Sequence, residues 1–159
     1  MEMPLNFRER VDIATRIVQN NYSNAAILTV EAFPEGGRPA KATELEKLKI
    51  IFAGPSIPGS GFSTIEITSC GWSEFKEPIV HHGPWGGSEI IKWPVKLDLA
   101  EAEERKDLAG FSGPSDKLNF GKPLCYPPIP HPLYNFIMIE KGMVIFVDAE
   151  TGEVHTQKM

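Results

Sequence analysis

The residues best suited to chemistry begin with four histidines and two cysteines. His81 and His82 are adjacent in the stretch His81-His82-Gly83-Pro84-Trp85, and adjacent side chains on an extended strand point to opposite sides. They can share one metal ion only if the backbone turns at Gly83-Pro84. No CxxC or HxxxH spacing supplies a further ligand. The sequence therefore predicts neither a metal site nor a bound cofactor.

Tryptophan is the second notable residue type. Trp72, Trp85 and Trp93 lie within about twenty residues of one another, and tryptophan is enriched at the energetic centres of binding interfaces. The three rings could line a pocket or a protein interface, or they could be ordinary core residues of a small domain. Both interpretations stay open.

Two short motifs suggest catalysis but lack the rest of the machinery. Ser73-Glu74-Phe75-Lys76 matches the Ser-x-x-Lys pattern of acyl-transferring hydrolases, without the other elements of those enzymes. The glycine-rich stretch 54–61 has no lysine after its second glycine, so a phosphate-binding loop is not supported. We therefore assign no catalytic residue.

A proline-rich segment is the least regular part of the chain. Five prolines fall within residues 123–132, which forbids a regular helix and predicts a loop at about 111–133. Such a loop either presents Tyr126 and His131 to a partner in a preformed shape or covers one edge of a sheet. The candidate binding residues are then Trp72, His81, His82, Trp85, Trp93, Tyr126 and His131.

Three segments carry the signature of a helix start, a capping residue followed three positions later by glutamate. They begin at Asn6, Thr43 and Asp98. The first predicts a helix over residues 7–20, the second a helix that ends near Ala53, and the third a charged surface helix over 99–109. The apolar stripe of the first helix is expected to pack on the sheet; the stripe is Phe7, Val11, Ala14 and Val18, and the sheet residues are Leu28, Ile137 and Ile145.

Strands are predicted between and after these helices. Residues 25–33 and 62–70 are β-rich, and 88–97 is expected to be extended, with Pro94 restricting it to an edge. Residues 134–140 and 143–148 form the clearest hairpin, followed by a last strand over 153–157. Because helices and antiparallel strands alternate without regular βαβ spacing, the expected class is α+β. The expected architecture is one domain over residues 1–159: an antiparallel sheet, an N-terminal helix on one face and two further short helices.

Composition and charge narrow the function further. Leucine, isoleucine, valine and phenylalanine make up about a quarter of the 159 residues, enough to bury a core. The net charge of −5 argues against non-specific binding of nucleic acid or of an anionic membrane. The start of the sequence has no basic and apolar signal pattern. We expect a cytoplasmic protein, a secreted one with its signal removed being the alternative, and we expect Cys70 and Cys125 to be unpaired thiols.

The stretch 144–154, Val-Ile-Phe-Val-Asp-Ala-Glu-Thr-Gly-Glu-Val, resembles the closing hairpin of PepSY-like domains. Followed by His155, it is also similar to the end of YrhB-type bacterial immunity proteins, as is the pair Gly71-Trp72. The resemblance covers about a quarter of the chain, and part of it is turn chemistry. It implies an α+β shape and a non-catalytic role in binding or inhibiting a protein partner, and it assigns no functional residue.

Two hypotheses follow. The first is a non-catalytic, immunity-like domain that binds another protein. The second is a small enzyme or ligand-binding protein whose pocket, lined by tryptophan and histidine, takes a small apolar ligand. A deep apolar pocket that contains a histidine would favour the second, and a flat exposed aromatic patch would favour the first.

Overall fold

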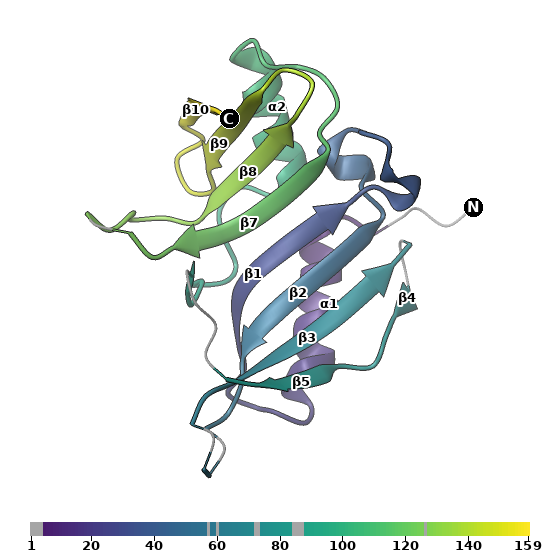
Figure 1. Ribbon diagram of the computed structural model, residues 1–159, viewed down its shortest axis with the longest axis vertical. Coiled ribbons are helices and arrows are strands. Elements are labelled where there is room, and N and C mark those ends of the chain that lie inside the picture. Colours follow the sequence, from purple (N-terminus) through teal and green to yellow (C-terminus); the bar gives the residue numbers. More distant parts are fainter. Residues whose placement is uncertain (1–4, 57, 60, 72–73, 84–87, 126) are drawn as a thin grey trace.

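The computed structural model describes residues 5–56, 58–59, 61–71, 74–83, 88–125 and 127–159. Within these ranges the chain forms two α-helices and one ten-stranded antiparallel sheet (Figure 1). The α+β class and the antiparallel sheet are confirmed, but two α-helices are present in the described ranges where three were expected.

The elements follow one another along the chain with short connections. The helices are α1 (Phe7–Gln19) and α2 (Leu99–Leu108), and two 3-10 turns are η1 (Glu35–Gly37) and η2 (Ala42–Glu44). The strands are β1 (Ala26–Phe33), β2 (Lys47–Ala53), β3 (Ser63–Cys70), β4 (Glu74–Phe75), β5 (Ile79–His82), β6 (Ser88–Glu89), β7 (Lys117–Pro123), β8 (Leu133–Met138), β9 (Met143–Asp148) and β10 (Val154–Lys158). The sheet order is β10-β9-β8-β7-β1-β2-β3-β4, with β5 on β3 and β6 on β7.

Both helices lie on the same face of the sheet (Figure 1). The side chains beneath them form rows across the strands, and the central row is fully buried; it runs Ile67, Ile50, Val30, Phe120, Tyr134 and Val147. Strands β1 and β7 pair in the middle of the sheet. Each is the first strand after a helix, and the two strands that follow it pair next to it in chain order, so a helix followed by three successively paired strands occurs twice; β4, β5, β6 and β10 are additional.

The first helix packs as its spacing predicts. Phe7, Val11, Ala14 and Val18 are all buried in the core. The expected sheet partners are only partly right. Ile145 belongs to the core, but Ile137 pairs with Lys117 and Val144 on the uncovered face. Leu28 is buried outside the core cluster, because a bulge between Ile27 and Thr29 turns Ile27 toward the helices instead.

The helix predicted after Thr43 is wrong, because most of this segment is β2. Leu48, Ile50 and Phe52 are buried on one side of that strand, and Lys47 and Lys49 point to the other. The spacing of Leu45, Leu48 and Phe52 indicates a helix, but Leu48 and Phe52, with Ile50 between them, also fit the period of two of a strand. Within a sheet the two consecutive isoleucines favour the strand.

Two extended segments also differ from expectation. The loop predicted at 111–133 contains β7, a central strand, because Leu118 and Phe120 alternate with polar residues before the prolines begin. In the segment 88–97 only the two residues of β6 are paired as a strand. The remaining predicted strands and both capped helices lie within two residues of the predicted limits at each end, whereas β4 and β5 were not predicted. Cys70 and Cys125 are free thiols, as expected.

Candidate functional site

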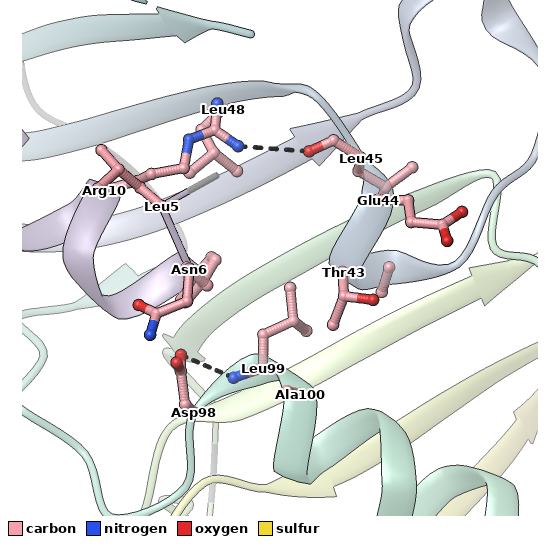
Figure 2. A pocket seen from close by; sticks show the side chains of 12 residues that line it. Leu5, Asn6, Arg10, Thr43, Glu44, Leu45, Leu48, Asp98, Leu99 and Ala100 are labelled. Atoms are coloured by element: carbon pink, nitrogen blue, oxygen red, sulfur yellow. Dashed lines mark hydrogen bonds between the residues drawn. The ribbon is translucent and has the colours of Figure 1, made fainter. Parts of the chain in front are cut away.

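A pocket of about 260 Å³ lies where the first turns of α1 and α2 meet the segment of η2 and β2 (Figure 2). Its floor consists of buried side chains, which are Phe7, Arg10, Ala42, Leu45, Leu48 and Leu99. Its rim consists of half-buried and exposed residues, which are Leu5, Asn6, Thr43, Glu44, Asp98 and Ala100. The floor is therefore apolar except for Arg10, and four of the six rim residues are polar or charged.

The two helix starts at the rim are closed by their own side chains. Asn6 Oδ1 accepts from the Glu9 N–H at 2.8 Å, and Glu9 Oε1 accepts from the Asn6 N–H at 3.1 Å. Asp98 and Glu101 form the same capping box at α2. Because the caps already use N–H groups of both first turns, these helix starts do not form a ready-made site for an anion.

Arg10 fixes one side of the floor. Its guanidinium donates to the carbonyl oxygen of Glu46, to that of Gly71 at 2.7 Å and to the Ser69 hydroxyl at 2.9 Å. Burial lowers the pKa of Arg10 to about 10, against the opposing effect of nearby Cys70 and Glu46. The side chain thus holds α1, β3 and the start of β2 together beneath the pocket.

Glu103 fixes the opposite side. It is a buried residue of α2, and its carboxylate accepts from the Ala42 N–H at 2.7 Å and from the Thr43 hydroxyl at 3.1 Å. These bonds attach η2 to α2. The second helix therefore positions part of the rim that belongs to the N-terminal half of the chain.

The rim is acidic. Glu44 is exposed, and Asp98 is half-buried with a pKa raised mainly by burial, which the Leu99 N–H and Arg8 partly oppose. Arg8 itself is turned toward backbone oxygens, donating to that of Val95 at 2.6 Å. Its positive charge lies beside Asp98 without lining the pocket.

The ionisable side chains among the described lining residues of the pocket are Arg10, Glu44 and Asp98. The described residues lining it include no histidine, cysteine, serine or lysine, so a nucleophile paired with an imidazole base does not occur among them. Elsewhere in the described ranges no three His, Cys, Asp or Glu side chains lie close enough to hold a metal ion.

The predicted site residues do not come together. His131 lines a separate hollow of about 420 Å³ with Lys92 and Lys122, and its Nδ1 lies 3.0 Å from Asp148 Oδ2. Lys122 lies 3.3 Å from a Glu89 carboxylate oxygen. Acidic partners thus balance two of the three basic groups of the hollow.

The adjacent histidines lie on β5, which pairs with β3 in the half of the sheet opposite β8 and β9 (Figure 1). His81 contacts Glu66 at 3.4 Å, and His82 is exposed. As expected for neighbours on a strand, the two side chains occupy opposite faces. They are therefore remote in the sheet from His131.

The Trp93 side chain makes contacts within the fold. Its indole N–H donates to Asp12 of α1 at 2.7 Å, and its ring meets Phe120 edge-on with centroids 6.0 Å apart. Trp72, Trp85 and Tyr126 lie outside the described residues. The four described candidates do not form a common pocket lined by tryptophan and histidine.

Sequence reasoning did not identify the apolar pocket, although two of its signals are visible in the chain. The capping boxes at Asn6 and Asp98 mark the helix starts that form the rim. What local patterns do not reveal is that these starts meet, since that depends on β1 pairing with β7.

None of the helices in the described part of the chain is long and apolar enough to cross a membrane. Comparison of the chain with protein-family models, with curated proteins and with solved structures finds no match in any of the three.

Proposed function

We propose that the protein is a non-catalytic binding protein that inhibits a protein partner, in the manner that the resemblance to immunity proteins implies. The observation that carries the proposal is the apolar pocket with its polar rim (Figure 2). Binding energy at protein interfaces concentrates where a side chain of one protein fills a well-packed pocket of the other. A cytoplasmic location is part of the proposal.

The alternative of a small enzyme or ligand-binding protein has less support. It required a histidine inside a deep apolar pocket, but His131 lies in the other, more polar hollow. The described lining of the apolar pocket supplies hydrophobic contact, two carboxylates and an arginine already bound to carbonyl oxygens. This combination favours recognition over turnover.

The test uses a substitution that covers the mouth of the pocket. Ala100 is an exposed residue in the first turn of α2, so Ala100→Phe adds a ring at the rim without entering the core. Ala109→Phe is the matched control, since Ala109 is also exposed and caps the far end of the same helix. Immobilised wild-type protein and both variants are compared by affinity capture from the source cells.

The expected result is a protein captured equally by wild type and Ala109→Phe, and at least tenfold less by Ala100→Phe. The captured protein is then purified, and its own activity is measured with each variant added. Wild type and Ala109→Phe should lower that activity, whereas Ala100→Phe should not. Equal capture by all three proteins would overturn the role of the pocket, and unchanged partner activity would overturn inhibition.

A further inference from the structure

We infer that the pocket receives an apolar side chain of the partner that lies beside a lysine or arginine. This inference rests on the proposed function and adds the chemistry of the partner segment. Three features carry it: the size of the pocket, its buried hydrophobic floor and the sign of the charge at its rim.

The size of the pocket suits one side chain. Sites for whole small-molecule ligands span about 300–1,000 Å³, and an apolar cavity of about 150 Å³ is large enough for benzene. At about 260 Å³ this pocket lies between the two. It can take a phenylalanine or leucine side chain together with part of the backbone that carries it.

The floor has the composition that such a side chain requires. Leu45, Leu48 and Leu99 are each at most 3% exposed, and Phe7 is 6% exposed. They come from three separate segments, so an inserted group would contact both halves of the molecule at once. Removing an apolar side chain from water into these contacts supplies the driving force for binding.

The charge at the rim selects a basic neighbour. Glu44 and Asp98 line the opening, and the capping residues Glu9 and Glu101 lie at the same two helix starts. Arg10 also lines the pocket, but it is 1% exposed and its guanidinium donates to backbone oxygens. A partner segment at the opening therefore reaches the rim carboxylates before it reaches this positive charge. An approaching segment therefore meets carboxylates, which attract lysine or arginine.

Nearby cations do not reverse this preference. Lys41 is exposed next to η2 but is not part of the lining. Arg8 is half-buried against the backbone oxygens of Val95 and Lys96. An anionic partner segment would meet the carboxylates of Glu44 and Asp98 at the rim, and two helix starts whose N–H groups are already capped.

The experiment uses capped tripeptides as probes of the full chain. Lys-Phe-Lys, Glu-Phe-Glu and Lys-Ser-Lys are titrated separately, together with 2-phenylethylamine, and the backbone amide signals of Leu45, Leu99 and Ala100 are followed by nuclear magnetic resonance. Peptides of this size bind weakly because association itself is costly. We expect dissociation in the millimolar range for Lys-Phe-Lys, at least fivefold weaker binding of Glu-Phe-Glu and at least tenfold weaker binding of Lys-Ser-Lys.

Charge variants provide the matched controls. Glu44→Lys reverses a rim charge, and Asp98→Asn removes one while keeping a good helix-capping residue. Glu104→Lys makes the same reversal at an exposed site of α2 outside the lining. Lys-Phe-Lys should bind at least threefold more weakly to the two rim variants and with unchanged affinity to Glu104→Lys.

Three outcomes would overturn the inference. Equal binding of Glu-Phe-Glu and Lys-Phe-Lys would remove the charge preference, and equal binding of 2-phenylethylamine would point to a small amine as the occupant. If no probe moves these signals while Ala100→Phe still loses the captured partner, the partner covers the pocket without inserting a side chain. In that last case the proposed function stands and the inference fails.

Discussion

The two halves of the molecule share an arrangement but are held together differently. In each half a capped helix precedes three antiparallel strands, and the helix lies on the same face of the sheet. Helix α1 buries an apolar stripe, which is Phe7, Val11, Ala14 and Val18. Helix α2 buries only Leu99 and Ala102 among apolar residues, and with them Glu103 and Lys106.

The polar side chains explain how the second helix stays in place. Lys106 Nζ donates to the carbonyl oxygen of Phe111 at 2.9 Å, just after the helix, and lies 5.5 Å from the ring centroid of Phe136 on β8. Glu103 bonds instead to η2, in the other half of the chain. A helix with little apolar surface can therefore dock when its buried charges are fully bonded. One of those bonds also shapes the pocket shared by both halves.

The largest expected effect tests the buried cation of the first half. Arg10→Met keeps the apolar stem but leaves the carbonyl oxygens of Glu46 and Gly71 without this donor. We expect a loss of about 3–4 kcal/mol in the free energy of unfolding, measured by chemical denaturation. Arg16→Met, at an exposed position of the same helix, should change it by less than about 0.5 kcal/mol. Equal effects of the two substitutions would mean that the hydrogen bonds from Arg10 to these carbonyl oxygens do not stabilise the fold.

The next effect compares the last turns of the two helices. Val18 is fully buried, whereas Leu108 is 78% exposed. Val18→Ala should cost about 1–3 kcal/mol, because it leaves a void against the sheet, and Leu108→Ala should cost less than about 0.5 kcal/mol. Thermal or urea unfolding measures both. A comparable loss of stability in Val18→Ala and Leu108→Ala would mean that Leu108 makes apolar contacts in solution, in disagreement with its exposed position in the structure.

A smaller effect isolates the link between the halves. Glu103→Gln replaces a charged acceptor of the Ala42 N–H by a neutral one, and the expected loss is about 1–2 kcal/mol. The Ala42 amide should also exchange its hydrogen with solvent faster than in wild type, because η2 loosens. Glu104→Gln changes the exposed neighbouring residue and should leave both quantities unchanged. If the Ala42 amide exchanged at the same rate in Glu103→Gln as in wild type, the bond between Glu103 and η2 would not stabilise the contact between the two halves.

The parts of the fold that followed from sequence are those with one dominant local signal. The box at Asn6 is followed by apolar residues with helical spacing, and the box at Asp98 by a run of alanine and charged residues with high helix propensity. The box at Thr43 failed because Glu103, sixty residues away, accepts the bonds that a helix start would have used. The strand after it was decided by neighbours in the sheet, which a local pattern does not contain.

The candidate site was harder to predict for the same reason. Its floor combines Arg10, Leu45 and Leu99 from three segments, and none of them has unusual chemistry in the sequence. The histidines and tryptophans were predicted to be binding residues because of their side-chain chemistry. In the structure, however, His131 and Trp93 make contacts that hold loops in place. Residue type therefore indicated possible reactions, but only the pairing of β1 with β7 located the pocket.

The smallest expected effect concerns the C-terminal half, where His131 holds the proline-rich segment to β9. Burial opposes ionisation of Asp148, but the N–H groups of Thr151 and Glu150 and the ring of His131 outweigh it and keep the pKa of Asp148 below its ordinary value of 3.8. A carboxylate of this kind stabilises the fold above its ordinary pKa, and that stability is lost as the pH falls through the lowered value.

His131→Ala removes one of these three partners, so the pKa of Asp148 should rise toward 3.8. At pH 5 the variant should be less stable than wild type by no more than about 1 kcal/mol, since the pair is partly exposed. Near pH 2 the difference should shrink as Asp148 becomes protonated in both proteins. His155→Ala, at an exposed pair with Glu153, should show no such dependence. A loss of several kcal/mol in His131→Ala at both pH values would instead mean that the segment is a structural cover of the sheet edge, required for the half itself to fold.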